Sequence, residues 1–310
     1  MKNLLFALFV LAALISTTLI ACSQELKKPF QVKEFKLNGA GHLVTKTSGG
    51  SIKVTGSAGN EVTVKMYVTP ANWSKRNEEP SAEALSRYNF DIRQEGNTIY
   101  AVAARKDKTW NKETGLQVSF EIEVPQQVST KLETSGGSIS LANVTGAQQV
   151  QTSGGSLTFK NIKGDTQART SGGSINLSHY SGKLEASTSG GSINLDEARG
   201  ALQLNTSGGG INLRQVSGDI YAHTSGGSIL AEVQQLGKYL TLATSGGSVK
   251  ATIPGGLGLD LDLSGNRVKT TVNNFNGQAK DNLVKGRLNG GGIPVKMSTS
   301  GGTTELNYRM

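Results

Sequence analysis

Acidic residues and histidines are the side chains in this sequence that could cleave a polysaccharide or hold a metal ion. Cleavage needs two carboxylates on one face, or a base beside a calcium site. Asp260 and Asp262 share a face if residues 259–263 form a strand, whereas the other acidic residues fall at unrelated positions. The three histidines lack the spacing of metal ligands: His42, His179 and His223. No Gly-x-Ser-x-Gly elbow with acid and histidine partners occurs. We therefore predict no catalytic centre, no metal and no cofactor.

Cys22 is the only cysteine among 310 residues, and it follows a segment typical of a secretory signal. Lys2 provides a basic head, and residues 4–20 are apolar apart from a Ser-Thr-Thr interruption. The run Leu19-Ile20-Ala21-Cys22 resembles the lipobox of bacterial lipoproteins, in which the cysteine is lipidated and becomes the first residue. We expect a signal peptide at 1–21 and a tether at 22–30. An ordinary signal peptide and an uncleaved anchor are the alternatives.

Both tryptophans lie in basic connecting segments near the N-terminus. Their immediate neighbours are cationic: Trp73 with Lys75 and Arg76, and Trp110 with Lys108 and Lys112. An indole ring can stack on the apolar face of a sugar while lysine and arginine meet its negative charge. These six residues are the predicted ligand-binding residues. The alternative is that each tryptophan covers the edge of a sheet and the charges are solvated.

The composition indicates a thin, repetitive β structure. Aromatic residues make up 5% of the chain and glycine contributes 40 residues, whereas an ordinary globular core needs more large side chains. The net charge of +9 favours acidic partners, and charge alone does not choose among glycans, lipid head groups and nucleic acid. For an exported protein we expect an envelope or host polysaccharide and no nucleic acid.

A Thr-Ser-Gly-Gly motif recurs along most of the chain. Seven copies follow one another, with five intervals of 18 residues and a last interval of 20. They begin at Thr134, Thr152, Thr170, Thr188, Thr206, Thr224 and Thr244. Two outlying copies begin at Thr47 and Thr299. Each unit contains two short segments with apolar residues at alternate positions, separated by a glycine. Period-2 apolarity punctuated by glycine is typical of strand and turn alternation.

Identical units gain stability when each forms one coil, because equivalent residues then stack at the strand spacing of about 4.8 Å. We therefore predict an all-β, single-stranded parallel β-solenoid with 18-residue coils, right-handed by the general chirality of parallel connections. By parity the threonines point inward and their hydroxyls satisfy the Ser-Gly-Gly turns, whose glycines permit positive φ and close stacking. Asn176, Asn194 and Asn212 should form a ladder.

The repeat TSGGSI-x-L, the turn that ends in glycine and the x-L-x-A segment together resemble the bacterial “putative-adhesin” family of β-solenoid proteins, a domain family of unknown function. The resemblance extends from about Gly41 to the C-terminus and includes Val124-Pro125 and the Gly290-Gly291-Gly292 run. It implies the solenoid fold and no catalytic residues.

The ends of the chain depart from the 18-residue period. Alternation at 62–68, 99–104 and 116–124 predicts strands, and 81–86 a short helix. The expected organisation is a first coil with an inserted β cap at 31–133, regular repeats at 134–252, and C-terminal coils and cap at 253–310. The expected function is a non-enzymatic, lipid-anchored envelope module that binds an anionic glycan. A structural or signalling partner of another envelope protein is the alternative, and a polysaccharide-cleaving enzyme the less favoured one.

Overall fold

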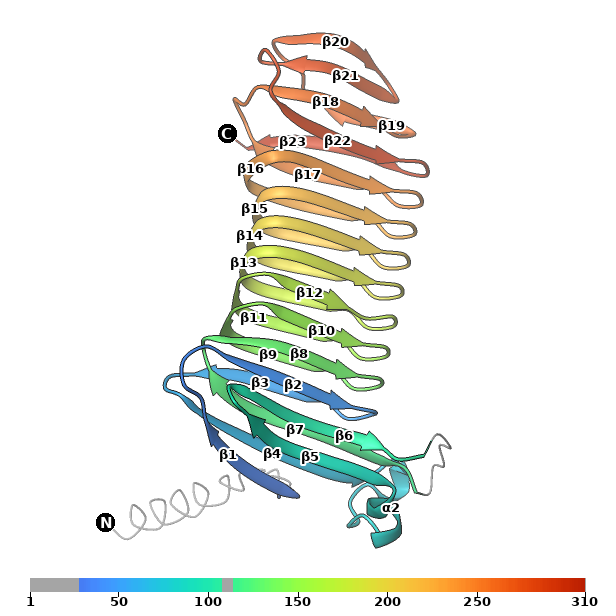
Figure 1. The fold of residues 1–310 in the computed structure, drawn as a ribbon. Helices are drawn as coiled ribbons and strands as arrows, with labels where there is room; N and C mark the ends of the chain where they lie inside the picture. The colour runs from blue at the N-terminus through green and yellow to red at the C-terminus, as the bar shows by residue number, and fades with distance from the viewer. Residues whose placement is uncertain (1–27, 108–113, 310) are drawn as a thin grey trace, which may run out of the picture.

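The protein is an open stack of parallel β coils, as predicted. The computed structural model describes residues 28–107 and 114–309, which form strands β1–β23, a 3-10 helix at Trp73–Lys75 and a short helix α2 at Ala82–Ser86 (Figure 1). All strands belong to one continuous sheet that winds around a narrow core. The predicted signal peptide at 1–21, Cys22 and the tether up to residue 27 lie outside the described residues.

The regular repeats form the middle of the stack. Equivalent residues pair in register, so that Ile175 lies beside Ile193 and Thr188 beside Thr206. The strands concerned are β8 (Val128–Thr134), β9 (Ile139–Thr145), β10 (Gln148–Thr152), β11 (Leu157–Lys163), β12 (Thr166–Arg169), β13 (Ile175–Thr188), β14 (Ile193–Thr206), β15 (Ile211–Thr224), β16 (Ile229–Thr244) and β17 (Val249–Pro254). From β13 to β16 the two segments of a coil are one long, bent strand.

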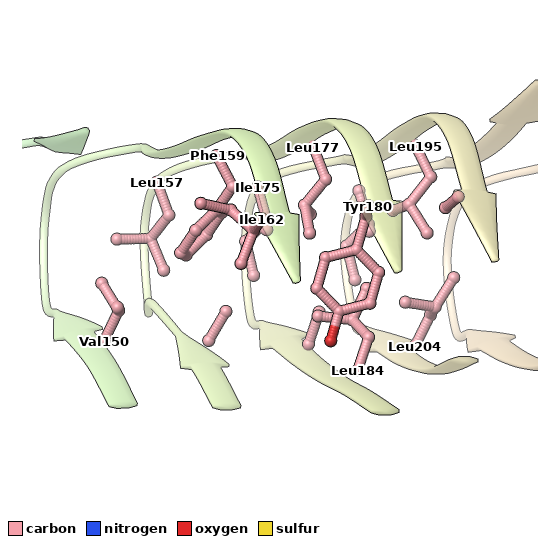
Figure 2. Close-up of a cluster of buried hydrophobic side chains, with 14 of the residues drawn as sticks. Val150, Leu157, Phe159, Ile162, Ile175, Leu177, Tyr180, Leu184, Leu195 and Leu204 are labelled. Carbon is pink, nitrogen blue, oxygen red and sulfur yellow. The ribbon is translucent and has the colours of Figure 1, made fainter. Parts of the chain in front are cut away.

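The bends of five consecutive coils each contain a residue in the left-handed conformation. These residues have φ between 53° and 60°: Asn143, Asn161, His179, Glu197 and Gln215. The next residue then points into the core and is buried: Val144, Ile162, Tyr180, Ala198 and Val216. Figure 2 shows Ile162 and Tyr180 entering the interior beside the expected Leu157, Phe159 and Leu177. The sequence analysis missed this third inward position.

The Thr-Ser-Gly-Gly turns are held as predicted by buried threonine hydroxyls. Thr152 Oγ1 donates to the carbonyl of Gly137 one coil below at 2.8 Å, and the amide of Gly155 in its own turn donates to Thr152 Oγ1 at 3.3 Å. Positive φ at these glycines is not found, which corrects that part of the prediction. Their role is close approach, because a Cβ on Gly155 would lie 2.0 Å from the Gly137 carbonyl oxygen.

The asparagine ladder is also confirmed. Asn194 Nδ2 donates to Asn176 Oδ1, and Asn212 Nδ2 donates to Asn194 Oδ1, both at 2.8 Å. A second, shorter ladder joins Asn161 Nδ2 to Asn143 Oδ1 at 2.8 Å. The amides therefore satisfy one another between coils and stabilise the stacking.

At the N-terminal end of the stack, called the base here (residues 28–107 and 114–125), the coils do not follow chain order. The strands are β1 (Gln31–Lys36), β2 (Gly41–Thr47), β3 (Ile52–Ser57), β4 (Glu61–Pro70), β5 (Tyr88–Glu95), β6 (Thr98–Arg105) and β7 (Leu116–Pro125). Strand β2 lies between β6 and β8, and β3 between β7 and β9, all parallel. Antiparallel β4 and then β1 continue one face of the stack beyond β7, and antiparallel β5 continues the other face beyond β6.

The opposite end, called the distal end (residues 255–292), repeats this arrangement with the C-terminus. Its strands, with the last coil, are β18 (Leu259–Ser264), β19 (Arg267–Thr270), β20 (Phe275–Lys280), β21 (Leu283–Leu288), β22 (Ile293–Thr299) and β23 (Thr303–Arg309). The coil of β22 and β23 lies between β16/β17 and β18/β19. Antiparallel β21 and then β20 complete the sheet at the top of Figure 1.

The two outlying motif copies thus join the threonine column. Thr47 pairs with Thr134, and Thr299 pairs with Thr244. Their hydrogen bonds match the others, since Thr134 Oγ1 donates to the Gly50 carbonyl at 2.9 Å and Thr299 Oγ1 to that of Gly247 at 2.6 Å. The predicted strands at 62–68, 99–104 and 116–124 are confirmed, as is the helix, which Ser81 caps.

Candidate binding surfaces

Trp73 lies in the connection between β4 and α2 and is the most exposed large apolar side chain described, at 77%. It therefore does not cover a sheet edge, and that alternative is wrong for this ring. The guanidinium carbon of Arg76 lies 4.9 Å from the ring centroid, a cation–π arrangement. Asn72 caps the 3-10 helix by accepting from the Ser74 amide at 3.2 Å, which fixes the segment that carries the ring.

The charges around Trp73 are mixed. Lys75 and Arg76, which follow Trp73 closely in the sequence, are exposed, and the exposed carboxylates Glu78 and Glu79 come within three residues of Arg76. The segment therefore carries no net charge, and a negative ligand group would be met by the two cations next to the ring rather than by a wide basic surface. Lys108, Trp110 and Lys112 lie outside the described residues, so a site shared by the two tryptophans remains a prediction.

A shallow open groove of about 410 Å³ runs over the outer face of the coils that carry the asparagine ladder. Asn176, Asn194 and Asn212 line it, and Leu230, 44% exposed, lies at its end. The Arg214 guanidinium makes a bidentate contact with Asp196, and this hydrogen bonding holds the pKa of the aspartate below its usual range. Because these polar groups already pair with one another, the groove offers few unsatisfied partners to a ligand.

The acidic pair Asp260 and Asp262, and His179, each lie beside a side chain of opposite charge or an acid. Asp262 lies 3.5 Å from Lys285 Nζ, and Asp260 lies 3.8 Å from Arg287 Nε, so the same-face pair is neutralised by β21. His179 lies 3.2 Å from Glu197. Across the described residues, no group of three or more histidine, cysteine or acidic side chains could hold a metal ion. No helix in the part of the chain described is long and apolar enough to cross a membrane.

The region from β17 onward is more basic than the regular stack, a feature that the sequence analysis did not single out. Residues 250–309 contain eight cationic and four acidic side chains, a balance of +4, whereas residues 134–249 contain seven and six, a balance of +1. Four of these cations are exposed and in no ion pair among the described residues: Arg267, Lys269, Lys280 and Lys296. The end of the stack farthest from the base is therefore positively charged.

The fold places the chain in the class of open parallel β-solenoids. Residues 197–307 match the Toastrack family DUF4097, which confirms the predicted resemblance to a family of repeat solenoids over that part of the chain. No curated protein matches the sequence.

Three crystal structures of bacterial proteins align with most of this chain at low similarity. One is described as a “putative adhesin” from Bacteroides fragilis, with 12% identity, 90% of this chain and 97% of that chain covered, and a TM-score of 0.40. A “putative cell adhesion protein” from Clostridium sporogenes has 12% identity, coverages of 91% and 100%, and a TM-score of 0.25. A “putative lipid binding protein” from Parabacteroides distasonis has 14% identity, coverages of 90% and 96%, and a TM-score of 0.39. At these scores the likenesses carry no argument about function.

Proposed function

We propose that this protein is an exported, lipid-anchored, non-enzymatic binding module of the cell envelope that takes a glycan at the Trp73 segment. The observation that carries the proposal is the exposure of Trp73, at 77%, on a capped helical turn with Arg76 against its ring. A large ring that is this exposed is costly in water and well suited to stack on a sugar.

An acidic sugar fits the cations beside the ring better than a neutral one. A carboxylate or sulfate at the edge of the stacked sugar would meet Arg76 and Lys75, whose hydrogen bonds to an anion are strong. Glu78 and Glu79 would disfavour a densely charged anionic polymer, because its negative groups would be repelled by these two nearby carboxylates. A polysaccharide with isolated acidic groups, from the envelope or from a host surface, is the ligand class that we expect.

Binding of the soluble protein, residues 23–310, to a panel of envelope and host polysaccharides at low and high salt tests this function. We expect Trp73→Ala to lower the affinity by about 5- to 150-fold, since stacking on one ring contributes about 1–3 kcal/mol. Tyr221→Ala is the matched control, because it removes an exposed ring on the side of the stack. Binding to no member of the panel, or equal losses in both variants, would reject the glycan site and favour an envelope protein as the partner.

The anchor is tested separately. Mass spectrometry of the protein isolated from membranes should find acyl chains on Cys22, and Cys22→Ser should release the protein from the membrane fraction. Two or more chains on one cysteine give stable attachment, whereas one chain binds only marginally. An unmodified Cys22 in the mature protein would reject the anchor without bearing on the glycan site.

A further inference from the structure

The outermost strands at the two ends of the stack differ in how their free edges are protected. A free edge presents unpaired backbone groups to other chains, and proteins commonly guard such edges with inward-pointing charges, proline, bulges or a covering element. At the base the free strands are β1 and β5, which each pair with one neighbour. At the distal end the outermost strand is β20, which pairs only with β21.

The base is closed by contacts between its two outermost strands. Lys33 pairs with the buried Val64, so its side chain points inward, and its Nζ donates to the Ile92 carbonyl of β5 at 2.6 Å. The rings of Phe30 and Phe90 lie 6.0 Å apart across the same end. An inward charge on an edge strand disfavours the addition of another strand, because pairing would bury it. The base is therefore guarded.

Apart from the exposed Lys280 at its end, strand β20 carries none of these guards. Its inward positions are Phe275, Gly277 and Ala279, which pair with Leu288, Gly286 and Val284 of β21. Its six residues include no proline, and its register with β21 is unbroken. The opposite sheet ends at β19, which pairs only with β23, so no strand faces β20 across the core. Gly277 and Ala279 are exposed as a result.

The backbone groups that face the open edge can be assigned. The Asn289 amide donates to the Asn274 carbonyl at 3.0 Å, so pairs that include even-numbered residues of β20 are hydrogen-bonded to β21. In an antiparallel ladder these pairs alternate with non-bonded ones. The amides and carbonyls of Phe275, Gly277 and Ala279 therefore point away from β21 and have no strand to pair with among the described residues.

We propose that β20 is a self-association site, at which a second copy of this chain adds its own β20 in antiparallel orientation. With Gly277 opposite Gly277 of the second copy, Phe275 lies opposite Ala279, and all three open residues form hydrogen-bonded pairs. This register also places Asn276 opposite Gln278 and Lys280 opposite Asn274, so no like charges meet directly. The result is a twofold contact between two distal ends, which suits the closed symmetry common in homodimers.

The size and charge of the contact set its strength. Pairing of two six-residue strands buries far less than the roughly 1,200 Å² of a stable interface, so the isolated dimer is weak. The positive distal ends repel, so added salt strengthens the dimer, the reverse of its effect on binding to an acidic glycan. With the chain anchored through Cys22 as proposed, its distal end points away from the membrane, so the contact would join molecules on two facing membranes. Many such weak contacts would then act together.

Analytical ultracentrifugation of the soluble protein over a wide concentration range tests the association. We expect the average mass to rise from that of the monomer toward that of the dimer, and to rise earlier at higher salt. Ala279→Lys places an inward charge on β20, as Lys33 does on β1, and should keep the protein monomeric. Val32→Lys, at an exposed position on β1, adds the same charge at the base and should leave the dimer unchanged. Circular dichroism checks that both variants fold.

Cysteine cross-linking tests the register. The soluble protein lacks Cys22 and so contains no other thiol. Residues 276 and 278 of the two copies form a non-hydrogen-bonded pair with Cα atoms about 4.5 Å apart, within the range for a disulfide. A mixture of Asn276→Cys and Gln278→Cys proteins should cross-link much faster than either alone. A protein that stays monomeric at every concentration, or variants that cross-link equally well alone and mixed, would overturn the proposal; neither result bears on the glycan site.

Discussion

At the base and at the distal end, a coil that carries an outlying Thr-Ser-Gly-Gly motif lies between two other coils. Strands β2 and β3 are held by β6/β7 on one side and β8/β9 on the other, and β22 and β23 by β16/β17 and β18/β19. The edges beyond these coils differ, since β1 and β5 contact each other through side chains while β20 has no opposite strand. Both ends of the stack thus hold a terminal coil between two others, whereas only the base has contacts that protect its free edges.

Removal of the last coil should have the largest effect. A chain that ends at Gly292 loses the buried side chains Val295, Met297 and Leu306, worth roughly 1.5–3 kcal/mol each. The distal end should then lose its protection against hydrogen exchange while the stack up to Pro254 keeps it.

Removal of β1 is the matched truncation at the base. A chain that begins at Leu37 loses one antiparallel strand with the half-buried Phe35, and its unfolding free energy should fall by only about 1–2 kcal/mol. Equal losses in the two truncations would contradict the distinction between an enclosed coil and an edge strand.

Glycine substitutions test whether the two enclosed coils are held equally. A Cβ on Gly50 would lie 2.0 Å from the Val118 carbonyl oxygen, and one on Gly302 would lie 2.3 Å from that of Gly247. Each change to alanine should lower the unfolding free energy by about 3 kcal/mol, because the backbone of a neighbouring coil must move. Gly49→Ala is the control, since its Cβ would lie no closer than 3.9 Å to other atoms. Denaturant unfolding measures all three, and a costly Gly49→Ala would contradict close stacking as the cause.

The regular stack between the two ends should lose stability at alkaline pH because of Tyr180. Burial raises the pKa of this tyrosine to about 12, and its hydroxyl lies 2.7 Å from the carbonyl oxygens of Gly164 and Lys183. The folded state then holds the proton more tightly than the unfolded state, so stability is complete below pH 10 and falls as the pH rises toward 12. The loss amounts to about 3 kcal/mol for a shift of this size.

Tyr180→Phe should flatten this part of the stability profile, measured by urea unfolding at several pH values. A profile unchanged by Tyr180→Phe would assign the alkaline transition to other groups.

The smallest change in stability is expected when the guard at the base is removed. Lys33→Val deletes the hydrogen bond to the Ile92 carbonyl, at a cost of about 1 kcal/mol, and leaves an apolar inward position on β1. New self-association of this variant in ultracentrifugation would sharpen the contrast between the two edges. A variant that associates no more than the wild type would show that Lys33 does not protect the base.

The sequence predicts the coils well because each contains the same strongly periodic pattern. Parity alone placed the threonines inward, and stacking of identical units predicted the asparagine ladder. The third inward position escaped because a left-handed residue breaks the alternation, so that Leu177 and Tyr180 both point inward three positions apart.

The order of the coils could not be read from the sequence. Alternation shows which face of a strand is buried but not which strand lies beside it. The motif copies at Thr47 and Thr299 were the available signal, because an identical turn fits the same column however far away it lies in the chain. The exposure of Trp73 depends on the path of an irregular connection, for which the sequence contains no periodic pattern.

The enclosure of β2 and β3 also determines how the molecule bears tension. A pull on residue 28 first reaches β1, which one neighbouring strand holds and which can detach alone. The next strand in the chain is β2, and to extract it the force must break its ladders to β6 and β8 together. At the other terminus, β23 is held in the same way by β17 and β19. Under load β1 would therefore detach first and lengthen the chain, while both terminal coils resist extraction and keep the coils between them folded.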